Sequence, residues 1–190
     1  MKPLVLATAL IALIAPLAGA QTSNWTADPA HSDVSFSIIH MGISTVRGHF
    51  GVTGSIAYNE ADVTKSTVNA TINVASVDTA QSARDNDIKG AQWFNAASFP
   101  TATFTSTSVA KSGNHLTING NLTLHGVTKP VVLDAQGPNG PITGMDHKPH
   151  AGFTATTTIK RTDFGIGANF PAAMVGDEVK LDIDLEVVKQ

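Results

Sequence analysis

The sequence predicts an all-β protein, an eight-stranded antiparallel barrel with a short α-helical lid between its third and fourth strands. Apolar and polar residues alternate in many short segments, a pattern typical of antiparallel sandwiches and barrels. Only 14% of the residues are charged, which fits a sheet with threonine and serine on its outside better than a helical bundle. The alternation is interrupted once, by a segment with helical signals. We therefore expect one β domain with one helix.

The first twenty residues have the order of a secretory signal peptide. Lys2 provides the positive start, 4–17 is an almost uninterrupted apolar run, and 18–20 are small residues. The apolar run is shorter than the roughly 20 residues that a membrane-spanning helix needs. We expect export with cleavage after Ala20, which leaves one domain, residues 21–190.

Composition limits the classes of partner and the means of stabilisation. The chain has no cysteine, so an exported domain must be held together by its core alone. A chain of this length can do so, since it buries about 70% of its unfolded surface. The formal net charge of −3 argues against nucleic acid or an anionic membrane surface as partner.

Four strands are predicted before and just after the interruption, at 31–40, 46–56, 68–74 and 101–109. In the first three, apolar or small residues recur at every second position, so that one face of the strand is apolar. Strand by strand, these residues are Val34, Phe36 and Ile38; Val46, Phe50, Val52 and Ile56; Val68, Ala70, Ile72 and Val74; and Phe104 in a segment rich in threonine and serine.

The predicted helix lies between the third and fourth strands. Asp78 or Thr79 can cap its N-terminus, and Gln81 stands three residues after Asp78 as in a capping box. We expect the helix to run over 80–89 and to stop at Gly90.

Three aromatic residues follow the helix directly: Trp93, Phe94 and Phe99, after which Pro100 bars further helix. A polar helix followed by aromatic residues fits a lid over one end of the barrel. It fits equally well a crossover that fills a hydrophobic gap, and the two interpretations are compatible.

Four more strands are predicted at 116–124, 131–135, 151–160 and 181–187, and a turn cluster at 137–141 opens a polar loop through Pro149. The apolar positions that share a face include Leu116, Ile118, Leu122 and Leu124; Phe153, Ala155 and Ile159; and Leu181, Ile183, Leu185 and Val187. Opposite the last group stand Asp182, Asp184 and Glu186, which we interpret as a solvated strand face.

Eight strands can close into a barrel that is filled by side chains or holds one small ligand. Small residues share the apolar phase at Gly48, Gly54, Ala70, Ala102, Ser106, Gly120, Ala151 and Ala155. Voids beside them would cost stability unless a guest fills them. The alternative is a slip of one residue in some strand, which would turn these positions outward.

Many segments resemble the YceI-like family of polyisoprenoid-binding proteins, in the same order along nearly the whole mature chain. They are Asp28–Phe36, His40, Arg47–Phe50, Gly54, Ser76–Thr79, Arg84–Asp85, Trp93–Phe94, Phe99–Ser106, Gly120–Pro130, Arg161–Gly165 and Val175–Val179. The most specific of them is Gly120–Pro130. The chain departs from the family after Asp85, where Trp93 replaces the first residue of an aromatic pair.

The resemblance implies a lipocalin-like barrel in the periplasm, with a long isoprenoid or related lipid, such as an isoprenoid quinone or its precursor, inside it. It implies a binding or carrier protein rather than an enzyme, with no cofactor besides the lipid and with the membrane only as the source of lipid. A homodimer is a further expectation from the family.

An apolar tail gains about 0.8 kcal/mol for each buried methylene, so the tail should dominate affinity and a few polar groups should select the head. The candidate lining residues are Phe36, Ile38, Phe50, Ile72, Trp93, Phe94, Phe99, Phe104, Leu122, Phe153, Phe164 and Phe170. For each residue alone, ordinary core is the favoured interpretation, but as a set they should include most of the lining. For the mouth we expect Arg84 and His40, and more weakly Arg161. Arg84 could instead form a salt bridge with Asp85 or Asp87.

Two other functions are alternatives: a metal-binding periplasmic stress protein and a lipid-modifying enzyme. There are seven histidines, but only His147 and His150 form a close pair, and no cluster has helical metal-ligand spacing. The sequence contains no Gly-x-Ser-x-Gly elbow and no glycine-rich phosphate loop. We therefore expect no metal site and no catalytic residues.

Overall fold

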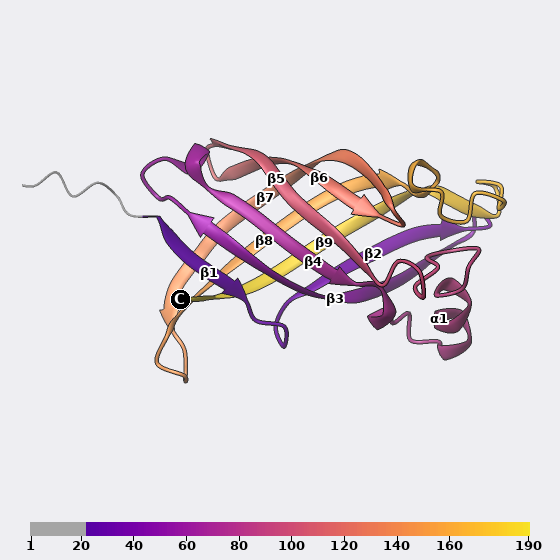
Figure 1. The fold of residues 1–190 in the computed structure, drawn as a ribbon, viewed down its shortest axis with the longest axis horizontal. Coiled ribbons are helices and arrows are strands. Elements are labelled where there is room, and N and C mark those ends of the chain that lie inside the picture. Colours follow the sequence, from indigo (N-terminus) through magenta and orange to yellow (C-terminus); the bar gives the residue numbers. More distant parts are fainter. Residues whose placement is uncertain (1–21) are drawn as a thin grey trace, which may run out of the picture.

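The computed structural model describes residues 22–190, which form an elongated β-barrel (Figure 1). The predicted signal peptide lies outside the described residues. The strands are β1 (Ser23–Ala27), β2 (Asp33–His40), β3 (Ser44–Tyr58), β4 (Thr67–Asn73), β5 (Thr101–Ser112), β6 (His115–Leu124), β7 (Val127–Thr143), β8 (Pro149–Lys160) and β9 (Val175–Lys189). The helices are α1 (Ser82–Ile88) and the short 3-10 helices η1 (Val63–Lys65), η2 (Val74–Ser76) and η3 (Arg161–Phe164).

The sheet closes on itself through antiparallel pairs. Neighbours in sequence pair from β2 to β9, and β9 then pairs with β2. β1 pairs with the end of β3 and the end of β9, beyond the point where β2 begins. β1 and β2 therefore occupy one place in the wall, and nine strands fill eight positions. The predicted eight-stranded antiparallel barrel is confirmed, with its first position split in two.

β1 was not predicted. Only Trp25 and Ala27 of its five residues are buried, and two apolar positions are too few to show an alternating pattern. β1 forms because both partners offer unpaired backbone groups there, as the pairing of Trp25 with Ile56 and with Lys189 shows.

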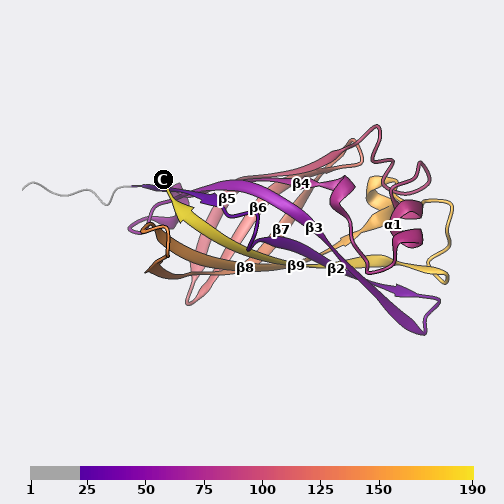
Figure 2. The ribbon, with the colours of Figure 1, turned by 90° about the horizontal axis from the view of Figure 1, so that it is seen from below.

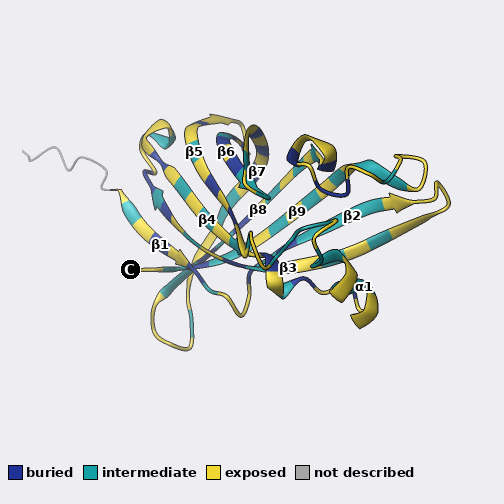
Figure 3. Cartoon of the chain, turned by 45° about the vertical axis from the view of Figure 1, so that its right-hand side comes forward, coloured by how far each residue is buried: buried dark blue, intermediate teal, exposed yellow. Residues whose placement is uncertain are grey.

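The predicted apolar faces point into the barrel. Buried and exposed residues alternate along most strands, as the colour bands in Figure 3 show. One cluster of buried side chains runs through the interior and includes Ile56, Phe104, Leu122, Phe153 and Val187. The predicted phase is thus correct.

Two small positions serve neighbouring rings. A Cβ atom at Gly48 would lie 2.7 Å from the ring of Phe36, and one at Gly120 only 2.2 Å from that of Phe104. Phe36 pairs with Gly48 across β2 and β3, so the ring lies over the glycine. These glycines therefore make room for aromatic side chains rather than leaving open space.

Helix α1 begins later than predicted. Its N-cap is Gln81, whose side-chain oxygen accepts hydrogen bonds from the backbone N–H groups of Ala83 and Arg84. Asp78 is not the cap because its backbone is paired with His49 of β3 in both directions. The helix lies at one end of the barrel (Figures 1 and 2). No helix among residues 22–190 is long and apolar enough to cross a membrane.

The predicted turn cluster at 137–141 is part of β7, which is longer than the predicted strand. Its pairing with β8 shifts register twice, between Gln136 and Asn139 and between Asn139 and Ile142. Gly137 and Gly140 have positive φ angles at these shifts, which glycine allows at little cost. The turn residues therefore build irregularities within a strand.

Candidate ligand-binding cavity

The barrel interior contains two adjoining cavities of about 270 Å³ and about 110 Å³. They share four lining residues, Val34, Ile72, Leu122 and Leu181. The larger cavity lies at the end covered by α1, and the smaller one lies towards the opposite end. Together they form an apolar space along the barrel axis.

A row of aromatic rings forms one wall of the larger cavity. The ring centroids of Phe36 and Phe50 are 5.4 Å apart, and Phe94 meets Phe50 edge-on, also at 5.4 Å. These rings come from β2, β3 and the segment after α1, so the wall joins the barrel to its cover. Edge-on and tilted pairs are favourable geometries for aromatic side chains.

The smaller cavity ends at another aromatic pair. Tyr58 and Phe153 meet at 6.0 Å between ring centroids, with an interplanar angle of 65°. Most of the remaining wall is apolar and includes Val52, Ile56 and Phe104, with Ser66, Thr154 and Thr157 as its polar members. Burial raises the pKa of the Tyr58 hydroxyl above its ordinary value of 10.0.

Four residues with polar side chains line the larger cavity: His40, Arg84, Asp87 and Arg161. All are at or near the α1 end. The cavity is therefore apolar along its length and polar at one end, the arrangement expected for a ligand with an apolar tail and a polar head.

Arg84 is held from one side only. Its Nε donates to the Thr79 hydroxyl and one Nη2 hydrogen to the Thr79 carbonyl, both at 2.8 Å. Asp85 instead accepts a hydrogen bond from the Thr79 N–H at 2.9 Å. Among the described residues Arg84 forms no salt bridge with Asp85 or Asp87, so the alternative considered from the sequence is not realised. Its Nη1 group makes no hydrogen bond within residues 22–190 and is available to a ligand.

Arg161 is a structural anchor instead. It is 3% exposed, and its guanidinium donates to five backbone carbonyls, those of Ile166, Gly167, Phe170, Val175 and Gly176. A guanidinium has five N–H donors, so none remains for a ligand. The expected role of Arg161 at the mouth is corrected: it holds the segment between β8 and β9 over the barrel end.

Most of the predicted lining residues border a cavity. The larger cavity is lined by Phe36, Ile38, His40, Phe50, Ile72, Arg84, Trp93, Phe94 and Leu122, and the smaller by Ile72, Phe104, Leu122 and Phe153. Their contact with a ligand stays a prediction.

Three predicted lining residues border neither cavity. Phe99 packs against His125 with 4.7 Å between ring centroids, and Phe170 stacks on Trp93 at 4.6 Å. Phe164 is the last residue of η3 and lies in the core, where it is 2% exposed. Of these three rings, that of Phe170 packs on a lining residue, Trp93.

Several lining residues are not among those predicted from the sequence, for example Val34, Ile88, Val175, Val179 and Leu181. Val34 shares a strand face with Phe36, and Leu181 shares one with Ile183, so the period of two was a sufficient signal for both. Val175 and Ile88 lie at element ends, where phase carries little information.

The sequence is similar to that of a known family over nearly all of the described residues. Residues 25–187 match the family described as the YceI-like domain. A UPF0312 protein of Shewanella putrefaciens is 40% identical, over 100% of this chain and 99% of its own length.

Two solved structures show the same fold. The Campylobacter jejuni YceI protein is 34% identical, with a TM-score of 0.71 over 86% of this chain and 96% of that one. A polyisoprenoid-binding domain from Saccharophagus degradans, implicated in plant cell wall breakdown, is 16% identical, with a TM-score of 0.64 over 90% of this chain and all of that one. With the match across almost every described residue, these findings establish that the chain belongs to the YceI-like family.

Proposed function

We propose that this protein binds a long-chain polyisoprenoid or similar lipid in the periplasm, with the tail in the two adjoining cavities and the head near Arg84 and His40. The observation that carries the proposal is an interior that is apolar over most of its length, with histidine, arginine and aspartate side chains only at the α1 end. The Saccharophagus degradans domain of the same fold, described as polyisoprenoid-binding, supports the class of ligand.

The energetics favour a tail over a compact ligand. Each buried methylene contributes about 0.8 kcal/mol, so ten give roughly 8 kcal/mol before ordering costs are subtracted. No single polar contact approaches that sum. The protein would then discriminate by tail shape first and by head group second.

The lipid would enter at the α1 end. Exposed apolar side chains gather there at the turn between β2 and β3: Met41 is 55% exposed and Ile43 is 83% exposed. Met174 of the segment before β9 is 51% exposed and accepts a backbone hydrogen bond from Met41. An apolar rim beside the polar end of the cavity suits transfer from a membrane.

We expect retention of the lipid rather than turnover, because Arg84 and His40 are needed only to hold the head group, while the donors of Arg161 are all bound to backbone carbonyls. The protein is on this view a carrier or store. A lipid-modifying enzyme would instead release altered lipid.

The test is native mass spectrometry of untagged protein purified from its own periplasm, followed by organic extraction and identification of any released lipid. One polyprenyl species per chain, recovered unmodified after incubation, supports the proposal. A lipid-free mass with no uptake of an added polyprenyl quinone would overturn it, and the same spectrum reports whether the protein is a dimer.

A further inference from the structure

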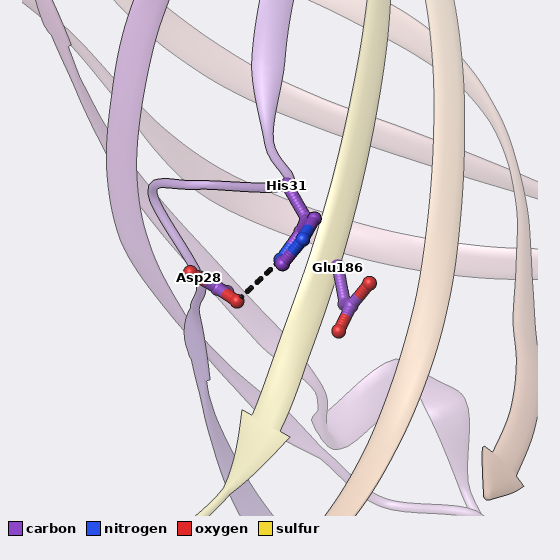
Figure 4. Close-up of side chains that lie close together, drawn as sticks. All are labelled: Asp28, His31 and Glu186. Carbon is purple, nitrogen blue, oxygen red and sulfur yellow. Dashed lines mark hydrogen bonds and ion pairs between the residues drawn. The ribbon is translucent and has the colours of Figure 1, made fainter. Parts of the chain in front are cut away.

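Titratable side chains from distant parts of the sequence lie together on the outside of the barrel, at the connection between β1 and β2. Asp28 and His31 lie in the connection between these strands, and Glu186 lies on β9 (Figure 4). One oxygen or nitrogen from each of the three lies within 4.8 Å of the others. The Nδ1 of His31 is 2.7 Å from the Oδ2 of Asp28.

The backbone already holds these residues together. The N–H of Asp28 donates to the carbonyl of Glu186 at 2.8 Å. The Ser32 hydroxyl donates to the same carbonyl and accepts from the N–H of Glu186, both at 3.1 Å. Ser32 is 7% exposed, so these bonds are shielded from water. The β1–β2 connection is therefore fixed on β9, and the ordering that a bound ligand would otherwise cost is largely in place.

A second histidine orients Glu186. The Nδ1 of His150 lies 2.7 Å from the Oε1 of Glu186, and its Nε2 lies 2.9 Å from the Oδ1 of Asp146. The side chain of His150 is only 15% exposed. Carboxylates that bind metals are commonly hydrogen-bonded in this way by a partner that is itself held in place.

The set of donors suits a borderline divalent cation. One imidazole and two carboxylates are ligands of zinc, whereas calcium and magnesium prefer oxygen alone. Tetrahedral bonds of 2.0–2.2 Å separate ligand atoms by about 3.3–3.6 Å. The three ligand atoms lie within 4.8 Å of one another, and the 2.7 Å contact of His31 with Asp28 is closer than this separation, so rotation of partly exposed side chains can reach it.

We propose that Asp28, His31 and Glu186 form a zinc-binding site, with water as the fourth ligand and His150 as the positioning residue for Glu186. The bound ion replaces the proton shared between His31 and Asp28. It ties the β1–β2 connection to β9 and so closes the one split position in the described barrel wall.

None of these residues lines either cavity, so zinc binding and lipid binding are separable. The sequence could not show the site, because Glu186 stands more than 150 residues from the other two ligands and reads as part of a solvated strand face.

The test is a zinc titration of the untagged protein, stripped with EDTA and measured against a competing chromophoric chelator. We expect one zinc ion per chain and a rise in the thermal midpoint when zinc is added. His31→Ala and Glu186→Gln should each weaken binding about tenfold or more and abolish the thermal shift, with lipid uptake unchanged as proof of folding.

His115→Ala is the matched control. His115 lies 2.8 Å from Asp134 in an exposed pair that no second carboxylate joins within residues 22–190. Its loss should leave zinc affinity and the thermal shift unchanged. Equal affinity of wild type and His31→Ala, or an equal loss in His115→Ala, would overturn the proposal and point to unspecific binding by surface histidines.

Discussion

Two arginines at one end of the barrel differ in what their guanidinium groups bind. Arg161 gives every donor to backbone carbonyls, whereas Arg84 gives two to Thr79 and keeps Nη1 free within the described residues. Both arginines line the larger cavity. The number of guanidinium N–H groups that remain without a protein acceptor is what separates a structural role from a ligand-binding one.

Arg84→Ala should weaken binding of a polar-headed lipid about tenfold or more, since hydrogen bonds to charged groups contribute roughly 1.5–3 kcal/mol. Binding of a bare hydrocarbon of equal length should change little. Fluorescence competition with the two ligands measures the difference. Arg47→Ala, an exposed arginine that lines neither cavity, is the control. Equal losses for both ligands would assign Arg84 a purely structural role.

A charge in the cavity should exclude the tail. Phe36→Asp and Phe153→Asp each place a carboxylate against apolar walls, where an unpaired charge is costly. We expect both to lose lipid in co-purification, while Phe36→Leu retains it. Circular dichroism checks folding, and a folded Phe36→Asp variant that still retains lipid would show that the tail lies elsewhere.

Among the elements, helix α1, which covers one end of the barrel, depends on a local hydrogen bond. The Thr79 hydroxyl donates to the carboxylate of Asp85, and this bond, with the backbone N–H of Thr79, holds the pKa of Asp85 below its ordinary value of 3.8. A carboxyl group with a lowered pKa in the folded state stabilises that state above its unfolded pKa. The contribution is lost as pH falls through the folded value.

Below about pH 4, amide hydrogen exchange in α1 should therefore speed up relative to the barrel strands. Asp85→Asn should show faster exchange already at pH 7 and less change on acidification. Thr79→Val removes the same hydrogen bond and should behave alike. An unchanged pH dependence in Asp85→Asn would show that another group controls the cover.

The turn between β2 and β3 should control transfer from membranes. Ile43→Glu with Met41→Glu should slow uptake from vesicles several-fold while leaving equilibrium affinity unchanged, because the rim lies outside the cavity. Met145→Glu, 99% exposed in the β7–β8 loop, is the control. Stopped-flow transfer of a fluorescent lipid gives the rates, and equal rates in all variants would place entry elsewhere.

Strands were predictable where apolar residues alternate over a long segment. β3 and β9 follow from Phe50, Ile56, Ile183 and Val187, whose inward phase the structure confirms. β1 was missed because it is short and depends on its partners. The helix cap was assigned wrongly because the pairing of Asp78 with His49 is a tertiary contact. Outside the strands residue type was the main guide, and it identified Trp93 and Phe94 as lining residues but failed for Phe99, Phe164 and Phe170, which border neither cavity.

For the molecule as a whole, the eight positions of the closed barrel fix the width of the interior, and the length of the strands fixes how far it extends. β3 runs the whole way, with Val46 and Phe50 on the larger cavity and Ile56 and Tyr58 on the smaller. The family resemblance correctly indicated the fold from sequence. The zinc-site cluster and the donor count of Arg161 required coordinates, because both depend on residues that are distant in sequence or on backbone atoms.

The aromatic pair of Tyr58 and Phe153, at the end of the barrel opposite α1, should set the longest tail that the interior can hold. In a series of lipids with one head group, affinity should rise about fourfold for each added methylene until the tail meets Tyr58 and Phe153, and then stay constant. Phe153→Ala should move that plateau to longer tails, at a cost of about 3–5 kcal/mol in the free energy of unfolding. Calorimetric titration across the series measures these affinities. An affinity that keeps rising with tail length would show that the tail passes out of the barrel.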